Sequence, residues 1–304
     1  MLETALLTSA WQATAPTLHI ALLGPPALVS GAQPVPIARR QSRALLYRIA
    51  AAPHPVPREH LCFLLWPDTP EATARRNLTV LLTQLRRALP SPDTFVLADD
   101  AIGLHPAFAT IDTAQFAVAT QHALRDGQPD ALADAVQLYR GPFLDGFALP
   151  AAAEFSAWMD QERQWWERRY LDALAALVEA YAAAHAYQNA IAAAQQVLAT
   201  DELAEDMHRH LIALYAATGD RTAALRQFER CVVALERELG VGPLPETRAV
   251  YEDVRDGRFS THKPNSSLRV VSDTTVTVGT AAPPTTRLLK LPAATASLLG
   301  RSEE

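Results

Sequence analysis

The 304-residue sequence has few cysteines and no long apolar run, and both absences limit what the protein can be. Its two cysteines, Cys62 and Cys231, lie far apart and belong to no CxxC pair, so we expect no disulfide framework. No apolar stretch approaches the roughly 18 residues that a membrane-spanning helix needs. The first residues, MLETALLTSAW, lack the basic segment of a secretion signal. Together these features predict a cytoplasmic protein.

Catalytic and nucleotide-binding motifs are missing as well. The chain contains no HExxH, GxSxG or GxxxxGK[ST] segment, and neither cysteine has the setting of a nucleophile. His208 and His210 are two positions apart on a predicted helix, so they point to different faces and make a poor pair of metal ligands. Asp99 and Asp100 are typical turn residues. We therefore predict no enzymatic activity, no catalytic site, no metal site and no cofactor.

The balance of charge changes along the chain. Residues 1–110 carry nine arginines and seven acidic residues, a net +2, whereas residues 111–256 carry twelve arginines and 23 acidic residues, a net −11. Residues 257–304 are net +3, and the whole chain is −6. Because an acidic surface repels a polyanion, we expect any nucleic-acid surface to lie in the N-terminal segment.

The segment from Leu61 to Leu89 has the pattern of a short helix, a turn and a longer amphipathic helix over residues 69–89. Asp68 or Thr69 can cap the second helix, and Pro70 suits its first position, where a missing N–H costs nothing. The 3.6-residue period of a helix then predicts an inward face. That face consists of Leu78, Leu82, Leu85 and Leu89, with Leu81 at its edge.

The opposite face of this helix has the composition of a surface that reads DNA. Arginine pairs with guanine, asparagine or glutamine pairs with adenine, and the methyl groups of threonine or valine contact thymine. An ordinary solvated face is the alternative, and for an isolated helix it is the more frequent one. Further arginines cluster at the start of a predicted helix over residues 39–51. The predicted DNA-binding residues are Arg39, Arg40, Arg43, Thr73, Arg76, Asn77, Val80, Thr83, Gln84 and Arg87.

The order of predicted elements in the first 110 residues is a sheet, three helices and a hairpin. The strands are expected at 18–23, 27–29 and 35–37, the helices at 39–51, 58–65 and 69–89, and the hairpin at 94–106. This order predicts a winged helix-turn-helix with an extra N-terminal sheet. The hairpin contains no Lys or Arg, so we do not expect it to insert a cation into the minor groove.

The rest of the chain is Ala/Leu-rich and helical, and it repeats itself, so the fold class is mainly α with a small β component. Residues Leu177, Tyr181, Ala182, Ala183 and Ala190 recur as Leu211, Tyr215, Ala216, Ala217 and Ala224. The offset of 34 residues is the tetratricopeptide (TPR) period, in which helix pairs stack on one another. Helices at 130–139 and 158–170 are expected to complete the stack. Core packing is the preferred explanation for Trp158, Trp165 and Trp166.

Several separated motifs carry a family resemblance over residues 17–256. LLWPD at 64–68, Asn77-Leu78 and LRRAL at 85–89 resemble the OmpR/PhoB-type winged helix of antibiotic-regulatory (SARP-like) activators. LYRGPFLDGF at 138–147, with PETR at 245–248, resembles the bacterial transcriptional activator domain (BTAD). The resemblance implies that the third helix enters the major groove. It also implies a turn that faces RNA polymerase, with Trp66, Asp68 and Thr69 as contact residues.

These observations give a domain plan and a function. We expect a loose arm at 1–16, a winged-helix DNA-binding domain at 17–110, a TPR-like BTAD at 111–256 and a flexible, disordered C-terminal tail at 257–304. The last residues, 297–304, resemble the entry to an ATPase module that this sequence does not contain. The predicted function is a sequence-specific DNA-binding transcriptional regulator, an activator, whose partners are double-stranded DNA, RNA polymerase and a second copy bound through the TPR-like domain. The alternatives are a TPR-based scaffold whose winged helix no longer binds DNA, and the N-terminal part of a larger ATPase regulator.

Overall fold

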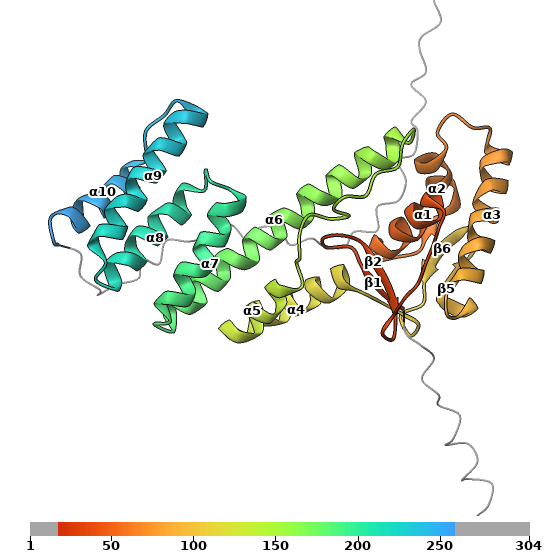
Figure 1. The fold of residues 1–304 in the computed structure, drawn as a ribbon, viewed down its shortest axis with the longest axis horizontal. Coiled ribbons are helices and arrows are strands. Elements are labelled where there is room, and N and C mark those ends of the chain that lie inside the picture. The colour runs from red at the N-terminus through yellow and green to blue at the C-terminus, as the bar shows by residue number, and fades with distance from the viewer. Residues whose placement is uncertain (1–17, 259–304) are drawn as a thin grey trace, which may run out of the picture. The chain divides into compact units, whose positions relative to one another are not determined.

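The computed structural model describes residues 18–258. The predicted arm, nearly all of the predicted tail and the predicted entry to an ATPase module lie outside the described residues. The fold is mainly α, with two small sheets in the N-terminal part followed by helices only (Figure 1). The predicted fold class is therefore confirmed, with a winged helix first and a TPR-like helical part after it.

The described N-terminal part contains three α-helices, a short 3-10 helix at Pro92–Thr94 and two sheets. Its elements are β1 (Leu18–Ala21), β2 (Ala27–Ser30), β3 (Gln33–Pro34), α1 (Arg40–Ala51), β4 (Val56–Pro57), α2 (Arg58–Leu65), α3 (Glu71–Ala88), β5 (Phe95–Ala98), β6 (Ala101–Leu104) and β7 (Ala109–Ile111). One sheet has the order β3-β2-β1-β7 and the other has the order β4-β6-β5. The β5–β6 hairpin that follows α3 is the wing.

The predicted strand at 35–37 is wrong. β3 lies at Gln33–Pro34, and its pairing with β2 ends after the Val35 N–H donates to the Leu28 carbonyl at 2.9 Å. The next residue, Pro36, has no N–H to continue the ladder. The two short strands that the sequence did not predict, β4 and β7, pair with β6 and with β1 respectively.

The predicted capping of α3 is also wrong. The N-cap residue is Pro70, the helix begins at Glu71, and no side chain caps it. The turn is held by the backbone instead, because the Thr69 N–H donates to the Trp66 carbonyl and the Thr73 and Ala74 N–H groups donate to the Pro70 carbonyl. The N–H groups at the start of α3 that a capping side chain would satisfy therefore have backbone acceptors instead.

The inward face of α3 is the one that the leucine period predicts. Leu78, Leu82 and Leu85 are buried, and so is Leu89 directly after the helix. Leu81, expected at the edge, is also fully buried. Burying a leucine stabilises a fold by roughly 1.5–3 kcal/mol, so several of them fix which side of α3 faces solvent.

The C-terminal part is a stack of helices. It contains α4 (Asp112–Asp126), α5 (Pro129–Gln137), α6 (Ala153–Ala183), α7 (Tyr187–Thr200), α8 (Glu205–Ala217), α9 (Arg221–Leu239) and α10 (Pro245–Arg255). The two 34-residue repeats correspond to the end of α6 with α7 and to α8 with α9, and Ala190 and Ala224 are fully buried at matching positions. The helix predicted at 158–170 does not end there. It is part of the 31-residue α6, since no glycine or proline interrupts that stretch.

Backbone contacts join the two parts of the chain around β1. β1 pairs in parallel with β7, and Leu23 forms a bridge with Phe143. The Asp112 carboxylate accepts hydrogen bonds from the N–H groups of Leu22 at 2.8 Å and Leu23 at 3.0 Å. Asp112 is the first residue of α4, and no side chain caps this helix, because the Asp112 oxygens accept from these two amides instead. The domain boundary near residue 110 stays a prediction, and these contacts cross it.

A second junction connects α1 with α6. The Arg48 guanidinium lies over the Trp158 ring, 5.1 Å from its centroid. The Glu162 carboxylate accepts the indole N–H groups of Trp158 and Trp166, both at 3.1 Å, and burial raises the pKa of this carboxyl. Core packing is thus confirmed for Trp166 and, in part, for Trp158. For Trp165 it is wrong, because that side chain is 48% exposed beneath Arg169.

We expect Asp112→Ala to destabilise the full chain by roughly 1–3 kcal/mol, the usual cost of leaving buried donors without a partner. The Leu22 and Leu23 amides belong to fully buried residues, and the Asp112 carboxylate is their acceptor. Urea unfolding measures the change. Asp134→Ala, at an exposed position of α5, is the matched control. A loss no larger than that of the control would contradict the role given to Asp112.

Candidate nucleic-acid interface

The predicted reading face of α3 points outward. Thr73, Arg76, Thr83 and Arg87 are exposed, and Val80 is 46% exposed. Asn77 is half-buried and Gln84 is exposed at the two edges of this face. The leucine face on the opposite side holds this orientation, so the structure brings the predicted residues of α3 together on one surface.

Some of these side chains already have partners. The exposed Thr83 side chain donates its hydroxyl hydrogen to the Thr79 carbonyl at 2.9 Å, which leaves its methyl group and the oxygen lone pairs for other contacts. The Gln84 side-chain oxygen accepts from the Ser42 hydroxyl at 3.4 Å, which leaves its amide N–H groups. Within residues 18–258, Arg76 and Arg87 form no ion pair. The two arginines are therefore available to a ligand.

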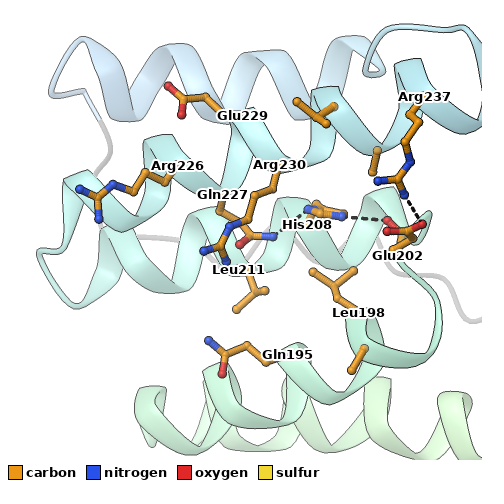
Figure 2. Close-up of a pocket in the computed structure, with 13 residues that line it drawn as sticks. Gln195, Leu198, Glu202, His208, Leu211, Arg226, Gln227, Glu229, Arg230 and Arg237 are labelled. Carbon is orange, nitrogen blue, oxygen red and sulfur yellow. Dashed lines mark hydrogen bonds and ion pairs between the residues drawn. The ribbon is translucent and has the colours of Figure 1, made fainter.

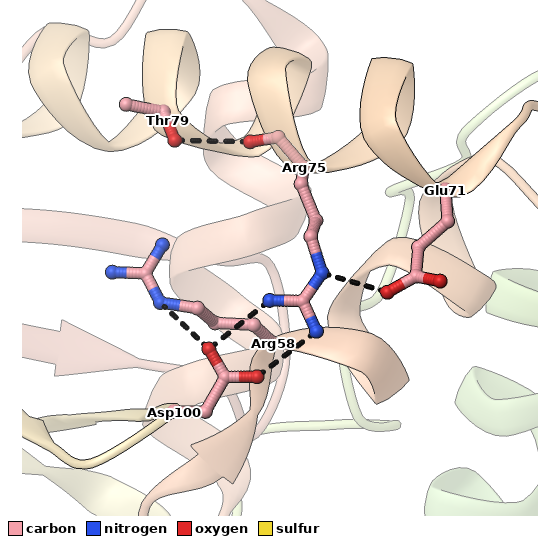
Figure 3. Close-up of polar contacts among 5 residues, drawn as sticks. All are labelled: Arg58, Glu71, Arg75, Thr79 and Asp100. Carbon is pink, nitrogen blue, oxygen red and sulfur yellow. Dashed lines mark hydrogen bonds and ion pairs between the residues drawn. The ribbon is translucent and has the colours of Figure 1, made fainter.

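Arg75, next to Arg76, is committed to the wing (Figure 3). Its guanidinium donates to both oxygens of Asp100, at 3.2 and 3.0 Å, and to Glu71 at 2.9 Å. The hydrogen bonds to Asp100 are the main reason why the pKa of Arg75 is raised. Arg58 of α2 also approaches Asp100, at 3.6 Å.

The turn predicted at Asp99-Asp100 is confirmed, with Asp99 in the left-handed region at φ 49°. The sequence did not predict that Asp100 would link the wing to α2 and α3. The available signal was an acidic wing that follows a helix with paired arginines. The contact neutralises Arg75 and holds the wing tip beside the first half of α3.

The start of α1 adds a second basic site. Arg39 is the N-cap residue and Arg40 the first helical residue, and both are exposed. The first turn has no acidic residue and no side-chain cap, so its free amides and the helix dipole favour a phosphate. The bond between Ser42 and Gln84 places this end of α1 beside the second half of α3.

Arg43 lies elsewhere. Its guanidinium carbon is 5.8 Å from the centroid of the Phe147 ring, and its side chain is half-buried. Arg43 therefore packs against the bend that precedes α6, and its cation is less accessible than those of Arg39 and Arg40. We leave it out of the proposed DNA contacts.

The turn predicted to face RNA polymerase connects α2 and α3. Asp68 is exposed, Thr69 is half-buried, and Trp66 packs partly against the apolar core. Trp66 is therefore mainly a packing residue of the turn. Asp68 is the accessible charged side chain that a partner could contact.

No cluster of three or more His, Cys, Asp or Glu side chains suitable for a metal ion occurs in residues 18–258. Burial raises the pKa of the Cys231 thiol to about 11, which keeps it protonated and unreactive at neutral pH. Among residues 18–258, each helix is too short or too polar to span a bilayer.

Comparisons with known proteins bear on the helical part and on the fold. Residues 111–255, from the end of β7 through α10, match the family described as the bacterial transcriptional activator domain. The solved structure of Mycobacterium tuberculosis EmbR, in complex with a low affinity phosphopeptide, is similar with a TM-score of 0.64 and 23% identity. The match covers 80% of this chain and 66% of the EmbR chain, and at this identity it shows the fold alone. No curated protein sequence matches this chain.

We expect Asp100→Asn to loosen the wing, because an amide cannot hold two arginines as a carboxylate does. Hydrogen exchange should become faster at the β5 and β6 amides and in the first turns of α3. Asp99→Asn is the matched control, since asparagine tolerates the left-handed conformation and Asp99 is the neighbouring residue of the same turn. Equal exchange in the two variants would show that Asp100 does not hold the wing.

Proposed function

We propose that the chain is a transcription regulator that binds specific DNA through α3, and the match of residues 111–255 to the bacterial transcriptional activator domain supports this proposal. The observation that carries the proposal is the outward face of α3. Arg76, with Thr73, Asn77 and Val80 around it, is free of ion pairs in the described residues, while the opposite face is locked into the core.

The dimensions of α3 fit this role. The major groove is about 12 Å wide and admits a helix of about 10–12 Å diameter. Helix-turn-helix proteins read base edges with the first part of the recognition helix. Arg76 lies in that part, whereas Arg87 is about three turns further along and is suited to a phosphate. Arg39 and Arg40 extend the phosphate contacts, because the start of α1 lies beside the second half of α3.

The remaining assignments rest on the family resemblance. We propose that Asp68, in the turn before α3, faces RNA polymerase and that the protein is an activator. The helical domain then serves self-association or contact with a partner protein. Double-stranded DNA, RNA polymerase and a second copy of the chain remain the proposed partners, and the cytoplasm remains the proposed location.

One structural observation favours a second candidate function. Asp100 and Glu71 neutralise Arg75, and the wing offers no Lys or Arg, so few free cations remain near the first half of α3. A TPR-based scaffold with a winged helix that no longer binds DNA would show the same features. DNA binding by the full chain separates the two functions.

We expect Arg76→Ala and Arg87→Ala to weaken DNA binding in different ways. Arg76→Ala should cost roughly 1–3 kcal/mol on the specific site and reduce the discrimination between sites, because a base contact is lost. Arg87→Ala should weaken all sequences alike and lower the slope of log K against log salt by about 0.9, because one phosphate contact is lost.

Fluorescence anisotropy with a specific and a scrambled duplex, across a series of salt concentrations, measures both effects. Arg125→Ala, at the end of α4, is the control for a charge change in the activator domain. If Arg76→Ala weakens both duplexes equally, it does not read bases. If neither variant loses affinity while both remain folded, the scaffold function is favoured.

A further inference from the structure

A cavity of about 660 Å³ lies between α7, α8 and α9 (Figure 2). Its apolar lining includes Leu198, Leu211 and Val233, and Val233 is 58% exposed. Cavities of about 300–1,000 Å³ are typical of ligand sites. The proposed DNA surface on α1 and α3 uses none of these residues.

Three arginines follow one side of α9 along this cavity. Arg226, Arg230 and Arg237 are separated by four and seven residues, a spacing that places them on one helix face. Arg237 already has ion-pair partners, since its guanidinium contacts Glu202 at 2.5 Å and Glu238 at 2.7 Å. Arg226 and Arg230 form no ion pair with any residue of 18–258.

The carboxylates near the cavity do not form ion pairs with Arg226 or Arg230. Figure 2 shows Arg230 extending toward Gln195 of α7, whereas the carboxylate of Glu229 points away from Gln195. The other lining acid, Glu202, is held by Arg237. The Arg230 guanidinium therefore lies beside the partly apolar space, and the Arg226 guanidinium extends outward at one end of it (Figure 2). Neither has an ion-pair partner among residues 18–258.

The wall of the cavity is built by a buried polar pair. His208 is 5% exposed and Gln227 is 3% exposed. The Gln227 amide donates to His208 Nδ1 at 2.7 Å, and His208 Nε2 donates to the Glu202 carbonyl at 3.0 Å. These bonds fix α8 against α9 and against the turn before α8. A fixed wall lowers the ordering cost of binding.

We propose that this cavity binds an extended acidic peptide segment of a partner protein. Its carboxylates pair with Arg226 and Arg230, and its aliphatic side chains lie on Leu198, Leu211 and Val233. Eleven residues of helix separate Arg226 from Arg237, which corresponds to about 16 Å, the length of about five residues of extended peptide. The Gln195 amide nitrogen donates one hydrogen bond to the Tyr215 hydroxyl at 3.0 Å, which leaves its second N–H and its carbonyl oxygen for the peptide backbone.

Charge favours a short peptide over nucleic acid as the occupant. Residues 111–256 carry a net charge of −11, so a long polyanion that extended past the cavity would meet a repulsive surface. A short segment contacts only the arginines and the apolar lining. The inference deepens the partner contact in the proposed function, and it is tested separately from DNA binding by α3.

The test uses the full chain and two fluorescein-labelled libraries of short peptides. One library combines Asp and Glu with Leu and Val, and the other replaces the acids by Asn and Gln. We expect the acidic library to bind at least about tenfold more tightly, a difference equivalent to one or two charge-assisted hydrogen bonds. The double variant Arg226→Gln/Arg230→Gln should remove this preference, because it keeps the helix and loses both charges.

Arg168→Gln, at an exposed position of α6, is the matched control and should bind like the unmodified protein. Thermal unfolding followed by circular dichroism checks that the variants fold. DNA binding of the double variant should be unchanged, which separates this proposal from the one for α3. The proposal is overturned if the acidic library does not bind, if both libraries bind equally, if the folded double variant retains the preference, or if it loses DNA affinity instead.

Discussion

The Asp112 carboxylate is the contact on which the arrangement around β1 depends. It accepts hydrogen bonds from the N–H groups of Leu22 and Leu23 where β1 stops pairing with β2, and it belongs to the first residue of α4, the first helix of the C-terminal part. The parallel pairing of β1 with β7 joins two segments that are about 90 residues apart in the sequence. The winged helix and the helical repeats consequently share one continuous apolar core from β1 to α8.

A carboxylate contact and a buried apolar face also determine which side chains α3 offers to a ligand. Burial of its leucines fixes one face, and the contact of Arg75 with Asp100 removes one cation from the other. The remaining face combines Arg76 with amide and methyl groups, which suits base recognition more than general attraction to a polyanion. A protein that depends on few cations should gain much of its affinity from the correct sequence and lose little to salt.

Patterns with a fixed period could be predicted from the sequence. The leucine face of α3 and the 34-residue repeat both depend on helix geometry, which is local. The contacts of Asp112 and Asp100 could not be predicted in this way, because each carboxylate binds donors that are distant in the sequence. Asp112 accepts from the Leu22 amide, 90 residues away, and Asp100 from Arg75, 25 residues away. Trp165 was misplaced because hydrophobicity alone does not say which face of α6 is covered. The arginine spacing on α9 was visible in the sequence, but the cavity it faces is formed with α7 and α8.

Selection of genomic DNA fragments by the full chain tests the central claim most directly. Fragments that are retained at physiological salt are sequenced and compared with the input. The account predicts strong enrichment of a small set of fragments that share one short motif. In a footprinting experiment, the bound protein should protect the bases of this motif. Retention of fragments in proportion to their length, without a shared motif, or no retention at all, would contradict the claim that α3 reads DNA.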